Sequence, residues 1–156
     1  LQLSPLCCLA VGVDRFDYTK GILERLHAVE RLLEKHPEWI ERFVFVQVAA
    51  PTRSALEEYQ AFQQRIHAVS ERINRRFGRD QYQPVHLLAE HHEHEAVNEL
   101  FRAADICVVT SLHDGMNLVC KEFVAARDDG RVVGEALRER IEARVQRHTA
   151  EPEDAD

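Results

Sequence analysis

The sequence lacks the glycine-rich motifs that most often bind phosphate groups. Neither G-x-G-x-x-G nor G-x-x-x-x-G-K-[ST] occurs, and the 156 residues include only six glycines. An ordinary dinucleotide-binding site and a P-loop therefore lose their main support. The formal net charge of −7 also excludes a general attraction to nucleic acid or to an anionic membrane. Any anion-binding site must therefore be built locally.

Membrane segments and paired metal-binding cysteines are missing too. No apolar run approaches the ~20 residues that span a bilayer, and no basic-then-apolar signal segment opens the chain. None of the four cysteines forms a C-x-x-C pair, which argues against a zinc or redox motif. Cys7 and Cys107 lie in apolar runs, so we expect buried, reduced thiols and a cytoplasmic protein. The chain starts at Leu1 and its only methionine is Met116, so we expect it to be part of a longer protein.

Four short apolar runs, rich in β-branched residues, alternate with longer helical patterns. We expect strands over Leu6–Val13, Phe43–Ala49, Val85–Ala89 and Ile106–Thr110. We expect helices over Lys20–His36, Arg53–Phe77 and Glu93–Ala104. The runs from Phe43 and Ile106 are nearly continuous in apolar residues, which is typical of strands covered on both faces. This alternation predicts one α/β domain, a parallel sheet wrapped by helices, with ligands bound at the carboxyl ends of the strands.

The segment after the first expected strand carries two cations just before a helix. Arg15 and Lys20 lie five residues apart, at a strand end and a helix start. Two such charges, together with the first amides and the dipole of the helix, suit a diphosphate group. The alternative is a charged turn in which Asp17 or Thr19 caps the helix.

The segment after the fourth expected strand combines a glycine with two carboxylates. Gly115 would let the backbone approach a ligand closely, and the amides from Gly115 to Leu118 would form a second helix N-terminus. Asp114 could accept hydrogen bonds from sugar hydroxyls, and Glu122, about two turns further on, could accept them from a ribose. The alternative is a surface helix with Asp114 as its cap.

The two segments together resemble a known family. The combination D-R-x-D-Y-T-K-G followed by S-L-H-D-G-M-N-L-V-x-K-E-F-V-A-A is similar to the trehalose-6-phosphate synthase family of retaining, two-lobed (GT-B) glycosyltransferases, over about Ala10 to Asp129. The resemblance implies the Rossmann-like C-terminal lobe of such an enzyme. It implies transfer of glucose from UDP-glucose to glucose 6-phosphate, forming α,α-trehalose 6-phosphate without a metal ion or other cofactor.

The resemblance also implies roles for individual residues. Arg15 and Lys20 match residues that grip the donor diphosphate, and Asp114 matches the carboxylate that holds the transferred glucose; these three would be the catalytic residues. Arg53 matches an arginine that reaches the phosphate of the acceptor. Backbone contacts to the glucose match Gly115, Met116 and Asn117, backbone contacts to the diphosphate match Leu118 and Val119, and the ribose contact matches Glu122.

A histidine-rich loop follows the third expected strand, in the order His91-His92-Glu93-His94-Glu95. Adjacent histidines do not point to one helix face and no set of four ligands emerges, so we expect no metal site. The resemblance places this loop beside the uracil ring, where His92 would stack or pack. A plain surface loop is the alternative.

The chain departs from the family pattern at both ends. We expect an incomplete nucleotide-sugar-binding lobe over residues 1–130, a divergent helix over 131–150 and an acidic tail over 151–156. The acceptor lobe would belong to the missing N-terminal part of the parent protein, and the isolated chain is expected to be inactive. Three hypotheses stay open: a trehalose-6-phosphate synthase, a glucosylglycerol-phosphate synthase, or a non-catalytic donor-binding module. The sequence also leaves the oligomeric state open, a homo-oligomer included.

Overall fold

A computed structural model describes residues 7–51 and 57–127 of the chain. The strands are β1 (Cys8–Arg15), β2 (Phe43–Ala50), β3 (Val85–Leu88) and β4 (Ile106–Cys107). The α-helices are α1 (Ile22–Lys35), α2 (Glu57–Phe77), α3 (His94–Ala103) and α4 (Leu118–Ala126). Two short 3-10 helices complete the set, η1 (Tyr18–Lys20) and η2 (Pro37–Trp39). Arg53 and the expected helix and tail over 131–156 lie outside the described residues.

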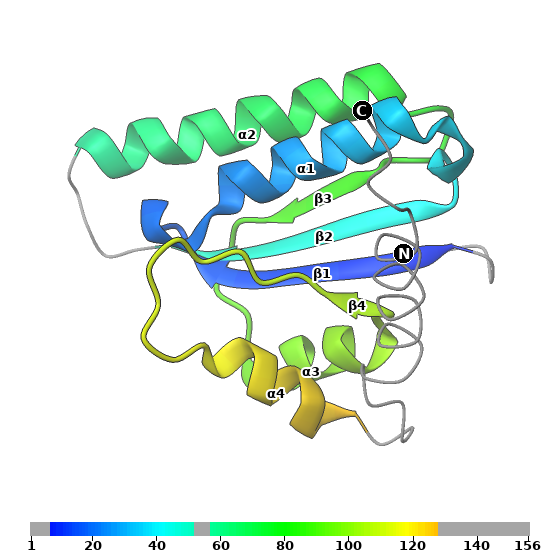
Figure 1. Cartoon of the computed structure of the whole chain (residues 1–156). Coiled ribbons are helices and arrows are strands. Elements are labelled where there is room, and N and C mark those ends of the chain that lie inside the picture. Colours follow the sequence, from blue (N-terminus) through cyan, green and yellow to red (C-terminus); the bar gives the residue numbers. More distant parts are fainter. Residues whose placement is uncertain (1–6, 52–56, 128–156) are drawn as a thin grey trace, which may run out of the picture.

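The four strands form one parallel sheet in the order β3-β2-β1-β4 (Figure 1). β1 pairs with β2 along its whole length, from Cys8 opposite Phe43 to Arg15 opposite Ala50. The chain runs outward from β1 to β3 and then returns to the other side of β1. This order is that of Rossmann-like folds, and the reversal between β1 and β4 is where such sheets bind ligands. The predicted parallel sheet wrapped by helices is confirmed.

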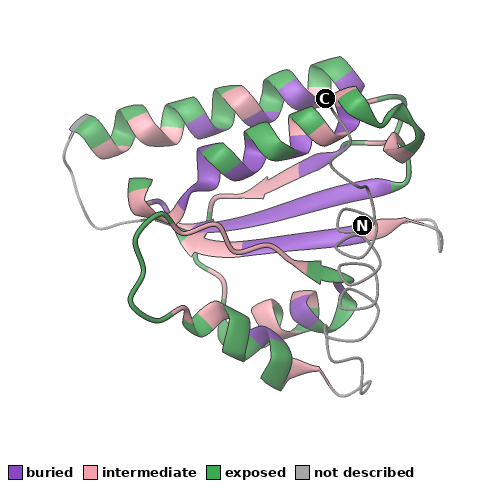
Figure 2. Ribbon diagram, viewed as in Figure 1, coloured by how far each residue is buried: buried purple, intermediate pink, exposed green. Residues whose placement is uncertain are grey.

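Helices cover both faces of the sheet: α1 and α2 lie on one face, and α3 and α4 on the other (Figure 1). The side chains of β2 alternate between the two cores, with Phe43 and Phe45 on the α1–α2 side and Val44 and Val46 on the other. All of Phe43–Ala49 is buried (Figure 2). The prediction that this strand is covered on both faces is confirmed, because both neighbouring layers contribute apolar side chains.

The prediction for the fourth strand was wrong in length and burial. β4 ends at Cys107, where a strand to Thr110 was expected, and Ile106 is 43% exposed. β4 is the edge of the sheet formed by the described residues, and only Ala10 and Val11 of β1 pair with it. Beyond Val108 the chain leaves the sheet and runs toward η1 and α1.

The first predicted helix begins two residues later than expected, after a glycine. Gly21 has φ +65°, a left-handed conformation that other residues rarely adopt, and it separates η1 from α1. Within α1, Ile22, Leu26, Val29 and Leu33 recur at helical spacing and are buried against the sheet. Each fully buried side chain of this kind contributes about 1.5–3 kcal/mol.

The cysteines are less buried than the sequence predicted. Cys7, Cys8 and Cys107 are only partly buried, Cys120 is exposed, and all four are free thiols. Cys107 is exposed in part because it lies on the edge strand. Burial is still sufficient to raise the pKa of Cys8 and of Cys107 to about 11. Among the described residues no helix has the length and apolar character needed to cross a membrane.

Candidate functional site

A cleft of about 380 Å³ opens at the carboxyl ends of the strands. Its walls come from the last residues of β1 and β2 and from the segments that follow β3 and β4. It therefore lies at the point where the strand order reverses, as the fold predicts for a ligand site. Every predicted donor-site residue except Gly115 lines it, namely Arg15, Lys20, His92, Asp114, Met116, Asn117, Leu118, Val119 and Glu122.

The first predicted segment presents its two cations at the edge of this cleft. Arg15 is the exposed last residue of β1. The chain then turns through η1, which Asp17 caps by accepting hydrogen bonds from the amide and the hydroxyl of Thr19 at 2.8 Å. Asp17 thus caps η1, whereas α1 follows Gly21 without a side-chain cap. The bonds of Asp17 fix the turn that carries Lys20 into the cleft.

The second segment begins its helix later than the sequence predicted. Asn117 is the N-cap of α4, and its side-chain oxygen accepts from the amide of Cys120 at 3.0 Å. The alternative in which Asp114 caps this helix is therefore wrong. The first amides of α4 belong to Leu118 and Val119, so the expected N-terminus over Gly115 to Leu118 is displaced by three residues. These first amides have no acceptor within the helix, as at any helix N-terminus.

Gly115 does not show the features expected of it. It lies outside the lining of the cleft, and a Cβ added there would meet nothing within 4 Å. In this structure no contact and no left-handed φ demands a glycine at that position. A close approach of this backbone to a ligand remains a prediction.

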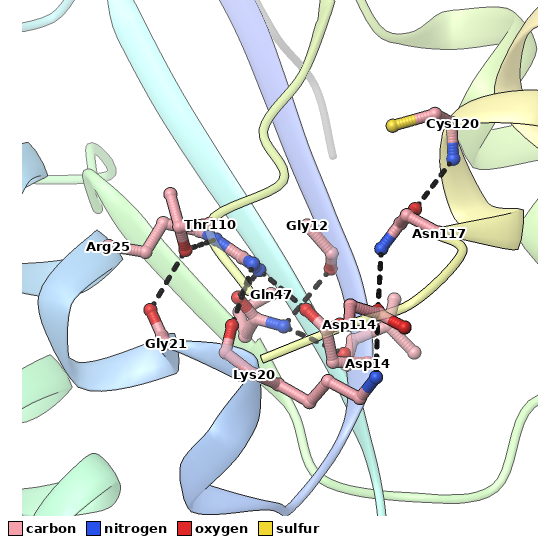
Figure 3. A network of polar contacts seen from close by, with 11 residues as sticks. Gly12, Asp14, Lys20, Gly21, Arg25, Gln47, Thr110, Asp114, Asn117 and Cys120 are labelled. Carbon is pink, nitrogen blue, oxygen red and sulfur yellow. Dashed lines mark hydrogen bonds and ion pairs between the residues drawn. The ribbon is translucent and has the colours of Figure 1, made fainter. Parts of the chain in front are cut away.

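The two segments, far apart in the sequence, are joined directly (Figure 3). The amide of Leu112 donates to the carbonyl oxygen of Thr19 at 2.7 Å. The hydroxyl of Thr110 donates to the carbonyl oxygen of Gly21 at 2.9 Å. Gly21 is needed here, because an added Cβ would lie 2.1 Å from the carbonyl oxygen of Thr110. The close contact between the segments therefore depends on a glycine that the sequence analysis did not single out.

Lys20 and Asp114 form an ion pair across the cleft, with Nζ 2.9 Å from Oδ2 (Figure 3). Asn117 Nδ2 donates to the same carboxylate oxygen at 3.2 Å. The hydrogen bond from Lys20 lowers the pKa of Asp114, so the carboxylate is charged at neutral pH. An ammonium group carries three donors, so Lys20 can contact an anionic ligand without giving up every bond it makes here.

A buried polar network beneath the cleft was missed by the sequence analysis. Arg25 of α1 is 1% exposed, and its guanidinium lies 2.8 Å from the carboxylate of Asp14 and 2.7 Å from Oε1 of Gln47. Burial raises the pKa of Asp14, and the nearby guanidinium of Arg25 counteracts part of that rise. One signal could have revealed the network: Arg25 falls within the apolar stripe of α1, three residues after Ile22 and four before Val29.

The histidine-rich loop after β3 forms one wall of the cleft. His91, His92, Glu93 and His94 all line it, and the contact of His92 with a base stays a prediction. The Nε2 atom of His92 is buried and has no hydrogen-bond partner among the described residues. Among all residues that the structure describes, no group of three or more histidine, cysteine or acidic residues is placed to hold a metal ion.

A Rossmann-like sheet with a cleft at its switch point is typical of nucleotide-binding α/β proteins. The model of glycosyltransferase family 20 matches residues 4–141, and the chain belongs to this family. It is 45% identical, over 79% of its length, to the UDP-forming α,α-trehalose-phosphate synthase of Pichia angusta, and 42% identical, over the same share, to the 56 kDa subunit of the Saccharomyces cerevisiae enzyme. The chain covers 26% and 25% of these relatives, about a quarter of their length.

Solved structures agree with this assignment. The Burkholderia xenovorans α,α-trehalose-phosphate synthase in complex with glucose-6-phosphate superposes with a TM-score of 0.76 at 41% identity. An E. coli protein with bound UDP-2-fluoro glucose gives a TM-score of 0.76 at 36% identity. In both cases the match covers 79% of this chain and 27% of the solved one. The predicted fold, a Rossmann-like lobe of the GT-B kind, is confirmed.

Proposed function

We propose that this chain is the donor-binding part of an enzyme that transfers glucose from UDP-glucose to glucose 6-phosphate, producing α,α-trehalose 6-phosphate and UDP. The observation that carries the proposal is the cleft in which the two predicted segments meet, with Arg15, Lys20 and the start of α4 around it. The names of the relatives and the ligands of the solved structures support the same choice. They do not favour glucosylglycerol phosphate synthesis or a non-catalytic module.

The charges around the cleft suit the transfer chemistry. As the glycosidic bond breaks, negative charge builds on the diphosphate of the departing UDP. Arg15 and Lys20 and the first amides of α4, at Leu118 and Val119, would stabilise that charge more in the transition state than in the ground state. The departing phosphate oxygen can itself take the proton of the acceptor hydroxyl, so no protein nucleophile is required in this lobe.

The remaining polar residues would hold the other parts of the donor. Asp114, bonded to Lys20, would accept hydrogen bonds from the hydroxyls of the transferred glucose. Glu122 lies one turn into α4 and lines the cleft, where it would accept from the ribose. His92 would lie against the uracil ring, which gives its buried Nε2 atom a polar neighbour.

Other parts of the proposal concern the surroundings of this lobe. Arg53 would contact the phosphate of glucose 6-phosphate, and a separate acceptor lobe would complete the active site. The reaction would need no metal ion, because the cations and amides supply the positive field at the diphosphate. The free thiols favour a cytoplasmic location. A homo-oligomer is compatible with these proposals and is not required by them.

Activity should be measured on a longer protein that contains this chain. Incubation with UDP-glucose and glucose 6-phosphate should release UDP and form a phosphorylated disaccharide, in EDTA as well as in magnesium. Turnover with glycerol phosphate in place of glucose 6-phosphate would contradict the proposed acceptor. Binding of UDP-glucose without turnover on any sugar phosphate would indicate a non-catalytic module.

A further inference from the structure

Arg25, buried beneath the donor cleft, forms hydrogen bonds with several elements of the site. Its guanidinium contacts Asp14 of β1 and Gln47 of β2, at 2.8 and 2.7 Å. Nε of the same side chain donates to the hydroxyl of Thr110 at 3.1 Å, and an NH2 group lies 3.4 Å from the carbonyl oxygen of Lys20 (Figure 3). One side chain thus contacts both segments of the proposed diphosphate site.

The backbone around the guanidinium leaves room for it. A Cβ added at Gly12 would lie 2.3 Å from an NH1 atom of Arg25 and 2.8 Å from Oε1 of Gln47. Gln47 is fully buried, and its amide nitrogen donates to the carbonyl oxygens of Gly12 and Val48 at 3.2 and 2.9 Å. Gln47 and the hydroxyl of Thr110 are therefore each oriented by a further bond. A planar, five-donor fork fits this set of acceptors, whereas a lysine could reach only part of it.

Charge balance also points to the site above. Asp14 lines the donor cleft, where an unpaired carboxylate would repel a diphosphate. Arg25 pairs with it from below, with side-chain exposures of 1% and 4% for the arginine and the aspartate. With Asp14 paired, the cations that line the cleft are Arg15 and Lys20, and the carboxylates of Glu93, Asp114 and Glu122 line it beside them.

We infer that Arg25 is a positioning residue of the donor site: together with Thr110 it fixes the Lys20 turn against the segment that leads into α4. This inference rests on the proposed donor site and adds a residue that does not itself contact the ligand. The bridge runs from Arg25 Nε to the hydroxyl of Thr110, and from that hydroxyl to the carbonyl oxygen of Gly21, next to Lys20. Loss of either link should misplace the ammonium group relative to the helix N-terminus.

The test is calorimetric titration of UDP into the full 156-residue chain, well below its melting temperature and with circular dichroism confirming the fold. Arg25→Lys keeps the charge but loses the fork, and Thr110→Val removes the bridging hydroxyl with little change in shape. Each should weaken UDP binding about 3- to 10-fold, the effect expected from losing a single hydrogen bond. Arg72→Lys is the matched control, because Arg72 pairs with Glu30 on the outer helices, away from the cleft. It should change the affinity less than about 2-fold.

A double-mutant cycle separates positioning from a general loss of stability. In a Lys20→Ala background, Thr110→Val should cost less than about 2-fold in UDP affinity, because the ammonium that it positions is gone. Unchanged affinity in folded Arg25→Lys and Thr110→Val proteins would overturn the inference. An equal loss from Thr110→Val with and without Lys20 would overturn it as well. If the unaltered chain fails to bind UDP, it is the proposed donor site that fails.

Discussion

Replacing Gly21 by alanine should both destabilise the fold and open the donor site. At φ +65° an alanine costs about 1–2 kcal/mol in backbone energy. The new Cβ would lie 2.1 Å from the carbonyl oxygen of Thr110, a backbone atom that cannot rotate away. The segments must then separate, and the hydrogen bond from the Thr110 hydroxyl to the Gly21 carbonyl, worth about 0.5–1.5 kcal/mol, is lost. The expected total is therefore about 1.5–3.5 kcal/mol.

Urea unfolding of the two proteins measures this difference, and Gly115→Ala is the matched control. Gly115 has ordinary φ and no atom within 4 Å of an added Cβ, so its substitution should change stability by less than about 0.5 kcal/mol. Folded Gly21→Ala protein should also bind UDP more weakly, since Lys20 moves with the turn. Equal midpoints for Gly21→Ala and the unaltered chain would refute the close approach of the two segments. A large loss in Gly115→Ala would refute the local geometry after β4.

Three further outcomes are expected. Burial raises the pKa of Tyr82 to about 12. Stability should therefore fall as pH rises from about 10 toward 12, because the phenol ionises first in the unfolded state. Tyr82→Phe should make this fall smaller in melting curves measured across that pH range, and an unchanged slope would exclude Tyr82 as its source. Exposed Cys120 should react with a maleimide at pH 8 before Cys8 and Cys107, whose pKa values are about 11, and peptide mapping that finds another order would contradict the burial. The isolated chain should release no UDP from UDP-glucose and glucose 6-phosphate. In a longer, active protein, Arg53→Ala should raise KM for glucose 6-phosphate more than KM for UDP-glucose. Equal effects on the two KM values would show that the assignment of Arg53 to the acceptor is wrong.

Local patterns in the sequence predicted the layers of the fold and where the site lies. Phe43–Ala49 was recognised as doubly covered because its apolar run has no polar interruption except Gln47. The segments after β1 and β4 stood out because charged and small residues directly follow apolar runs, and the carboxyl ends of parallel strands meet at one edge. These inferences need only periodicity and strand direction, which neighbouring residues encode.

Features that depend on long-range contacts were not predictable in this way. The short β4 reflects its edge position, which no residue within Ile106–Thr110 reveals. The helix α4 starts later than expected because Asn117, and not Asp114, caps it. The carboxylate of Asp114 is instead bonded to Lys20, 94 residues earlier in the chain. The role of Arg25 depends on its partners Asp14 and Gln47, which belong to β1 and β2 and not to its own helix. Its position within an apolar stripe was the one local sign.

Titration of UDP into the chain and its Lys20→Ala variant tests most directly whether the cleft is a metal-independent diphosphate site. One charged hydrogen bond to a phosphate is worth about 1.5–3 kcal/mol. Lys20→Ala should therefore bind UDP about 10- to 150-fold more weakly, while Glu122→Gln should lose less because its amide keeps one acceptor. Equal affinity of the unaltered chain in EDTA and in magnesium, with the expected loss in Lys20→Ala, is the predicted result. Strict dependence on magnesium, or full affinity in folded Lys20→Ala protein, would contradict the diphosphate assignment.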